Sequence, residues 1–195
     1  MSEPIGRASI GDDAGLMGRV RDGDQTALAV LMANWELPLK SFLGRIVLNA
    51  SEAEELAQET FVAVWQHRAR FRLGAEFKPW VFTIALNLAR KRLRWWRRRP
   101  SVSLDEWMDT DSGRVGAVGE ESTGADRLVR TEVAAAVRDA IAALPPDLRE
   151  AIVLFEYEDL SHAEIAAIVD ATPKAVETRI HRAKEKLRAA LKAWA

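Results

Sequence analysis

Five side chains near the C-terminus have the types and the spacing needed to contact DNA bases. On a helix, residues three and four apart share one face, and these five would share theirs. The face presents donors and acceptors of hydrogen bonds, which is the chemistry that distinguishes base edges in the major groove. Lys and Arg residues farther along the same helix would contact phosphates. The five candidates are Lys174, Glu177, Thr178, His181 and Arg182.

Two predicted helices position this face. Ser161 and Glu164 form a capping box that opens a short helix. After a turn, Thr172 can cap a longer helix and Pro173 can take its first position. A short helix, a tight turn and a longer basic helix are typical of a helix-turn-helix, although an ordinary helical hairpin with a solvated basic face has the same pattern. The buried side of the second helix is expected to contain Val176, Ile180, Ala183, Leu187 and Leu191.

A second basic block spans Arg90 to Arg99, and seven of its ten residues are Lys or Arg. Cations at this density bind phosphates without regard to sequence, and salt weakens such binding. Trp95 and Trp96 lie within the block. They could stack on unpaired bases or pack against the core, and the sequence favours neither.

The remaining chemistry is sparse. The predicted helix from Ser51 to His67 has an acidic and amide face, which by itself indicates only a solvated surface. No phosphate-binding Gly-rich loop, G-x-S-x-G or H-E-x-x-H motif occurs. The three His residues are too far apart to be helical metal ligands, and the absence of cysteine excludes disulfides, zinc thiolates and a thiol switch. We therefore expect no enzyme activity, cofactor or metal.

The elements that carry these residues are all predicted to be helices, because apolar residues recur at helical spacing and no segment alternates with period two. Ser51 and Glu54 form another possible capping box. The fold class is therefore all-α. The predicted helices are Asp12–Arg21, Gln25–Trp35, Leu39–Val47, Ser51–His67, Phe77–Arg98, Leu128–Ala143, Asp147–Tyr157 and the two helices of the helix-turn-helix.

The charges divide the 195 residues into three unlike segments. The formal net charge of -1 is the sum of +5 for residues 1–99, -6 for residues 100–126 and zero for residues 127–195. We interpret the first and last as two small helical domains. The middle segment is rich in Gly, Ser, Thr and Asp, which is typical of a flexible acidic linker, with one possible helical turn near residues 104–108. It could be a plain tether or a polyanion that mimics nucleic acid in a cationic groove.

The location of the protein is predicted from two further features. No apolar run approaches the roughly 20 residues that a membrane span requires, and the first ten residues do not resemble a signal peptide. These features favour a cytoplasmic protein.

In their order along the chain, several motifs resemble the extracytoplasmic-function (ECF) group of sigma-70-type RNA polymerase sigma factors. Residues 54–65 (EELAQETFVAVW) are similar to the family's region 2.2, and residues 77–87 (FKPWVFTIALN) to regions 2.3 and 2.4. Residues 143–150 (ALPPDLRE) resemble the start of domain 4. Residues 160–166 (LSHAEIA) and 176–184 (VETRIHRAK) resemble its helix-turn-helix.

The resemblance implies partners and roles that the residues alone do not. The first domain would bind core RNA polymerase and the promoter's -10 element, while the second would recognise the -35 element. The resemblance also implies an anti-sigma factor and, around residues 144–155, a contact with the flap of the β subunit. The implied contacts are Glu55, Gln58 and Glu59 for the β′ clamp helices; Lys78, Asn87, Arg90, Lys91 and Arg94 for the -10 element; and the five helix-turn-helix residues above for the -35 element.

Three positions depart from common family patterns: Lys91, Ala175 and Glu177. They leave the promoter sequence open. Because a relaxed linker of this length averages only about 26–31 Å, far less than the roughly 70 Å between two DNA sites two turns apart, we expect the polymerase to set the spacing of the domains. Two other interpretations stay open: a helix-turn-helix regulator that binds operators as a dimer, and a helical protein that binds no DNA.

Overall fold

The computed structural model describes residues 13–98 and 124–192, with side chains from residue 131 in the second range. Throughout these residues the regular elements are helices, as predicted. The first half contains α1 (Asp13–Arg21), α2 (Gln25–Val47), α3 (Ala50–His67), the short 3-10 helix η1 (Arg68–Arg70) and α4 (Phe77–Arg97). The second half contains α6 (Gly124–Ala142), α7 (Pro146–Glu156), α8 (His162–Val169) and α9 (Pro173–Ala190).

The structure joins two helices that the sequence predicted separately. α2 continues from Gln25 to Val47 through Pro38. The proline removes the N–H that would bond to the carbonyl of Asn34. However, Trp35 and Leu39 on either side of it are buried in the core, and this packing holds the helix continuous.

The predicted capping box at Ser51 is wrong. α3 begins at Ala50, and its N-cap is Asn49, whose side chain accepts a hydrogen bond from the N–H of Glu52 at 2.9 Å. Ser51 therefore lies within the first turn. The C-cap of α2 is Leu48, in a left-handed conformation with φ of 61°, so the caps of the two helices are adjacent residues.

The helix-turn-helix elements match their prediction closely. Ser161 and Glu164 form the capping box of α8, and Thr172 caps α9 at the N–H of Ala175 with Pro173 in the first turn. α6 begins at Gly124, before the predicted Leu128 and inside the segment interpreted as linker. The possible turn near residues 104–108 lies outside the described residues.

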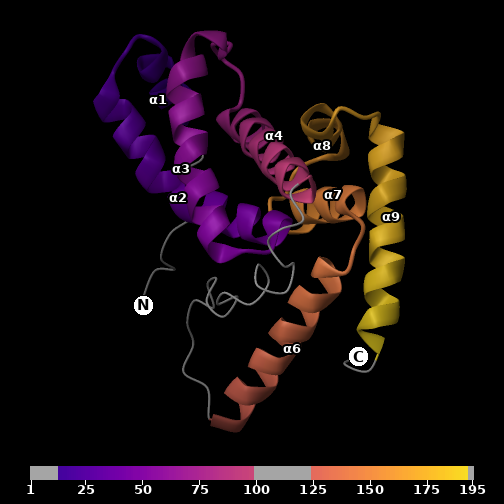
Figure 1. Cartoon of the computed structure of the whole chain (residues 1–195). Coiled ribbons are helices and arrows are strands. Elements are labelled where there is room, and N and C mark those ends of the chain that lie inside the picture. The colour runs from indigo at the N-terminus through magenta and orange to yellow at the C-terminus, as the bar shows by residue number, and fades with distance from the viewer. Residues whose placement is uncertain (1–12, 99–123, 193–195) are drawn as a thin grey trace, which may run out of the picture.

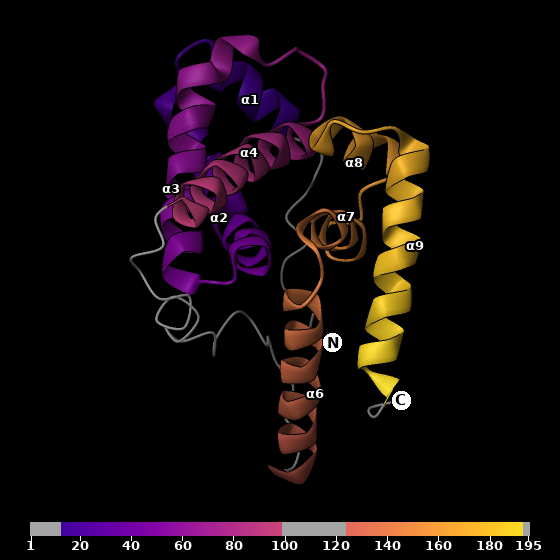
Figure 2. The ribbon, with the colours of Figure 1, turned by 45° about the vertical axis from the view of Figure 1, so that its right-hand side comes forward.

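The two halves pack directly against each other. α7 lies against α2, and α8 lies against α4, in both views of the ribbon (Figure 1 and Figure 2). The buried apolar residues of both halves belong to one cluster, which runs from Leu16 to Ala183. α6 and α9 extend away from this junction in the same general direction (Figure 2). We call this packed arrangement the closed form.

Candidate nucleic-acid interface

The α9 face predicted to contact bases is open to solvent. Its five candidates, Lys174, Glu177, Thr178, His181 and Arg182, are all exposed. The helix is held from its other side by Val176, Ile180 and Ala183, which are buried. The structure therefore brings these five residues together on one accessible face.

The partners of this face lie mostly on α9 itself. The Lys174 ammonium donates to the carboxylate of Glu177 at 2.9 Å, and both side chains are more than half exposed. This hydrogen bond lowers the pKa of Glu177. His181 lies 3.5 Å from the carboxylate of Glu185, one turn farther along. Such exposed pairs within one helix are weak and exchange readily with water or phosphate.

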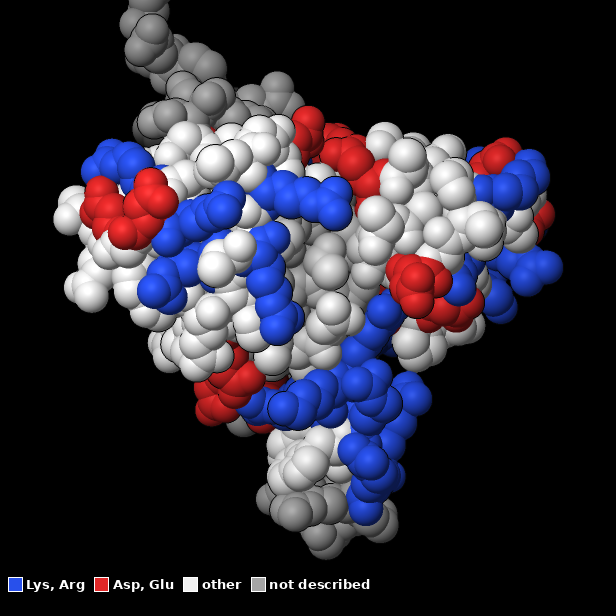
Figure 3. Space-filling view, turned by 90° about the horizontal axis from the view of Figure 1, so that it is seen from above, with Lys and Arg blue, Asp and Glu red and all other residues white. Residues whose placement is uncertain are grey.

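A second accessible stripe runs along α4. Asn87, Lys91 and Arg94 are exposed and follow one another at helical spacing, and Arg98 continues the stripe beyond the end of the helix. Lys and Arg side chains gather toward the C-terminal part of α4, next to a group of carboxylates (Figure 3). Three of the five predicted contacts for the -10 element are thus available together, and Arg98 is an addition within the basic block.

The other two predicted contacts face carboxylates of the second half. Arg90 makes two hydrogen bonds to Glu150 of α7, at 3.0 and 2.5 Å, and this pairing raises the pKa of Arg90. Lys78 lies near Glu158 and Glu164, where its charge favours the ionised carboxylates. In the closed form, Arg90 is therefore engaged by a carboxylate of the second half.

The Trp residues of α4 have different environments. Trp80 is half-buried and packs edge-on against Phe71, with ring centroids 5.2 Å apart. Trp95 is 40% exposed and lies edge-on to Trp96 at 5.1 Å. The C-terminal part of α4 thus presents an aromatic ring beside its cations.

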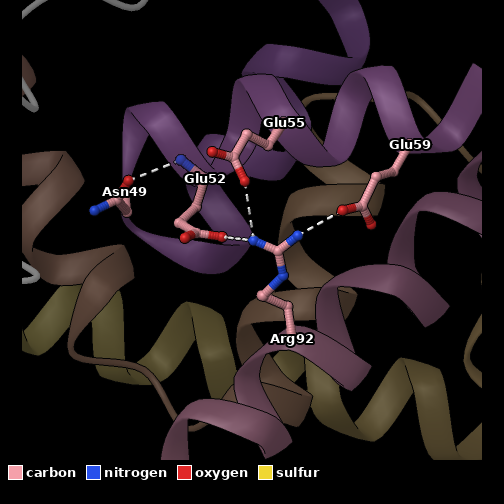
Figure 4. A network of polar contacts seen from close by, with 5 residues as sticks. All are labelled: Asn49, Glu52, Glu55, Glu59 and Arg92. Carbon is pink, nitrogen blue, oxygen red and sulfur yellow. Dashed lines mark hydrogen bonds and ion pairs between the residues drawn. The ribbon is translucent and has the colours of Figure 1, made fainter. Parts of the chain in front are cut away.

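Three acidic residues of α3 contact one side chain of α4. Glu55 and Glu59 point toward α4, where the guanidinium of Arg92 also contacts Glu52 (Figure 4). Arg92 is only 21% exposed. Its burial alone would lower its pKa, but the contacts with Glu55, Glu52 and Glu59 raise it overall. Two of the three predicted contacts for the polymerase thus also join α3 to α4.

The third predicted contact, Gln58, is a neighbour of Glu55 on α3 but lines a groove of about 600 Å³ between α2 and α3. Apolar side chains form much of this groove, including Met32 and Val62, which are 40% and 56% exposed. Lys40 stands at the groove and pairs with both Glu36 and Glu54 at 2.8 Å. The groove has an apolar floor and charged edges, as protein interfaces do.

The contribution of α2 to this groove was missed from the sequence. Leu28, Met32 and Trp65 line it together with the α3 residues. The sequence did contain an indication of this groove, because Met32 and Val62 are large apolar residues that lie outside the buried stripes of their helices. Single exposed apolar residues are common, however, and only the packing of α2 on α3 brings these into one surface.

Apolar side chains of α7, and Leu144 in the turn before it, were expected to contact the β flap and are buried in the closed form. Leu144, Leu148 and Ile152 are each no more than 6% exposed. α7 packs against α2 as well as α8 and α9. Its N-terminal part is also held by Arg149, whose guanidinium donates to three carbonyls at the end of α6 and to the carbonyl of Ile46 at the end of α2.

Comparison with known proteins identifies the family. The sigma-70 region 2 family matches residues 31–99, and the sigma-70 region 4 family matches residues 134–187. The RNA polymerase sigma factor CarQ of Myxococcus xanthus is 38% identical over 88% of this chain and 93% of its own length. The ECF sigma-E factor of Escherichia coli K12 is 35% identical over 89% and 91%. The chain belongs to the ECF sigma factors.

Solved structures show the same fold. The structure of CnrH in complex with the cytosolic domain of CnrY covers 94% of this chain and 99% of that chain, with 29% identity and a TM-score of 0.65. The sigma factor RpoE of Bartonella quintana, in complex with the anti-sigma factor NepR, covers 80% and 92%, with 26% identity and a TM-score of 0.61. As a sigma factor, the protein is a transcription initiation factor that acts with core RNA polymerase at promoters.

Two searches of the described residues were negative. In residues 13–98 and 124–192, no helix is both long and apolar enough to cross a membrane. Within the same residues, no group of His, Asp and Glu side chains is arranged to hold a metal ion.

Proposed function

We propose that this ECF sigma factor uses three separate surfaces for its three contacts. The groove between α2 and α3, with Gln58 on its edge, receives the clamp helices of the β′ subunit. The α4 stripe of Asn87, Lys91 and Arg94, together with Arg90 and Lys78 once these are released, contacts the -10 element. The α9 face contacts the -35 element.

The accessible α9 face is the observation that best supports this proposal. Five side chains with hydrogen-bonding groups stand on the N-terminal half of a helix that is capped by Thr172 and follows a tight turn. In helix-turn-helix proteins, this is the part of the second helix that enters the major groove.

The factor itself supplies no catalytic group in this proposal. Its side chains bind and orient the promoter, while the polymerase performs RNA synthesis. Because both partners are in the bacterial cytoplasm, the factor acts there.

Transcription in vitro from a library of genomic fragments tests the proposal. Core polymerase alone should give no specific starts, and the added factor should produce starts that share two upstream elements. A stand-alone regulator would instead bind DNA fragments tightly and specifically without polymerase, and that result would contradict the proposal.

The proposed groove can be tested with a matched pair of variants. Gln58→Ala combined with Val62→Ala removes a hydrogen-bonding group and an exposed apolar side chain, and we expect the affinity for core polymerase to fall by about tenfold or more. Gln66→Ala, an exposed change on the same helix outside the groove, is the control and should bind core polymerase as wild type does. Unchanged affinity of the double variant would remove the groove from the interface.

We also propose that an anti-sigma factor holds this protein inactive. Both similar solved structures are complexes with a second protein, and in the Bartonella quintana structure that protein is an anti-sigma factor. An anti-sigma factor that covers the α2–α3 groove would compete with core polymerase. Competition for binding between purified core enzyme and candidate regulators would test this.

A further inference from the structure

A third group of basic side chains lies outside both helices proposed to contact DNA. It comes from the end of α1, from η1 and from the loop that follows η1. The guanidinium of Arg21 lies 3.5 Å from the carbonyl oxygen of Phe71, and the buried ring of Phe71 anchors this loop in the core. Lys and Arg side chains gather over this end of the molecule in the view from above (Figure 3). We call the group the η1 patch, and it consists of Arg21, Arg68, Arg70 and Arg72.

The η1 patch differs from the neighbouring basic residues because no carboxylate neutralises it. Arg19 of α1 pairs with Asp24 at 2.7 Å, and Arg92 of α4 pairs with carboxylates of α3. Among the described residues, no ion pair joins a carboxylate to any residue of the η1 patch. Arg68 is half-buried, and the other three residues are exposed. Since gathered charges of one sign repel each other, the patch does not serve stability and is available to an anionic partner.

Flat and apolar side chains accompany these cations. The guanidinium of Arg68 lies over the ring of Trp65, 4.3 Å from its centroid. Leu73, in the loop that follows η1, is 67% exposed. Surfaces that bind single-stranded nucleic acid combine cations for the phosphates with flat side chains on which bases stack. The composition of the η1 patch therefore favours single-stranded DNA over an acidic protein.

The η1 patch also continues the surface proposed to hold the -10 element. Residues 71–76 connect η1 directly to the N-terminal end of α4, whereas Asn87, Lys91 and Arg94 occupy later turns of that helix. Base recognition by α9 in the major groove requires duplex DNA at the -35 element. Unpaired DNA next to the -10 element therefore lies on its other side, toward the transcription start.

We propose that the η1 patch binds the unpaired strand of promoter DNA that continues from the -10 element toward the transcription start. Its cations contact phosphates, and Arg68 on Trp65 offers a stacking surface, so the contact does not depend on the base sequence. This inference rests on the proposed function of α4 and extends the DNA contact of the first half beyond the -10 element.

Fluorescent oligonucleotides of two lengths test the η1 patch in the holoenzyme. Both carry the unpaired strand of the -10 element; one ends there, and the other continues toward the transcription start with a short run of thymidines. Arg70→Gln combined with Arg72→Gln should weaken binding of the longer oligonucleotide by about fivefold and leave the shorter one unaffected, because two phosphate contacts are lost. For the longer oligonucleotide, the slope of log affinity against log salt concentration should become shallower by about 1.4.

Two control variants make the result specific. Arg19→Gln combined with Arg138→Gln removes the same amount of charge, from a cation paired with Asp24 and from an exposed position of α6, and it should bind both oligonucleotides as wild type does. Lys91→Gln, on the α4 stripe, should weaken binding of both lengths to the same extent.

The dependence on length decides the proposal. If the Arg70 and Arg72 double variant binds the longer oligonucleotide as tightly as wild type, or loses affinity equally for both lengths, the proposal is wrong. Weaker binding of this variant to core polymerase without DNA would assign the η1 patch to the polymerase interface and would also overturn it. If Lys91→Gln changes neither affinity, the assignment of α4 to the -10 element fails, which is distinct from the absence of a length-dependent effect.

Discussion

The two helices proposed to contact DNA differ in where their cations find carboxylates. On α9, Lys174 pairs with Glu177 within the same helix, and both side chains remain exposed. On α4, Arg92 pairs with three carboxylates of α3, and Arg90 pairs with Glu150 of the other half. The exposed cations Lys174 and Arg182 of α9 are therefore available for binding. Arg90 and Arg92 of α4 instead hold the structure together, as do Arg179 and Lys184 of α9, which pair with carboxylates of α7. A count of positive charges along a helix does not distinguish these cases.

The largest expected effect concerns stability. Arg92→Met should lower the free energy of unfolding by about 2 to 3 kcal/mol, because it leaves Glu52, Glu55 and Glu59 close together without their common cation; the value allows for the partial exposure of the cluster. Urea denaturation monitored by far-UV circular dichroism would measure it. Lys91→Met, at the exposed neighbouring position, should change stability by no more than about 0.5 kcal/mol. If both variants changed the free energy of unfolding equally, Arg92 would not hold α4 against α3, and the proposed difference between α4 and α9 would be wrong.

The pH dependence of stability provides the next test. Burial raises the pKa of Glu158 to about 7, despite the nearby charges of Lys78 on α4 and Arg45 on α2; the neighbouring Asp159 raises it further. Since the folded protein holds this proton more tightly than the unfolded chain, the contribution of Glu158 to stability is fully present below about pH 4.5 and is lost as the pH rises through about 7.

Glu158→Gln should remove this dependence. At about pH 8 the variant should be more stable than wild type by about 2 kcal/mol, and at about pH 5 the difference should be much smaller. Thermal unfolding at both pH values would measure it, with Glu132→Gln, at an exposed position of α6, as the control. An identical difference at both values would show that Glu158 does not titrate in this range.

The sequence predicted a structural feature correctly when the contact that stabilises it lies between residues close together in the chain. The α8 capping box and the Thr172 cap involve neighbours three residues apart, so residue types alone predicted them. The first residue of α3 was not predicted correctly, because Asn49 and Ser51 can both cap a helix. The left-handed conformation of Leu48 at the end of α2 decides between them. Pairs such as Arg90 and Glu150, 60 residues apart, depend on the packing of the halves.

The same distinction applies to the candidate sites. The five α9 residues follow from the spacing of one helix, and all five are accessible. Glu55, Gln58 and Glu59 also lie on one helix, but the positions of α2 and α4 direct Gln58 to a groove and the two Glu side chains to Arg92. Positions of neighbouring helices cannot be derived from the periodicity of α3 alone.

Recognition by α9 should be sensitive to single side chains. Arg182→Ala should reduce transcription from promoters that depend on the -35 element by about tenfold, the size expected for one base contact, without a measurable loss of stability. Arg188→Ala, farther along α9, should weaken binding to all sequences alike, because a phosphate contact carries no base preference. Transcription from promoter pairs with intact and altered -35 elements separates these effects. If Arg182→Ala affects both promoters equally, Arg182 contacts phosphate rather than a base.

The smallest expected effect tests whether the local pair on α9 is readily exchanged. Glu177→Gln removes a negative charge next to Lys174 while keeping a polar side chain, so affinity for promoter DNA in the holoenzyme should rise by about two- to threefold at low salt and return to the wild-type value at high salt. Glu185→Gln, which changes the partner of His181, is the matched control. If Glu177→Gln instead weakens binding only at promoters with a cytosine opposite this position, the carboxylate accepts a hydrogen bond from that base and the pair with Lys174 opens on binding.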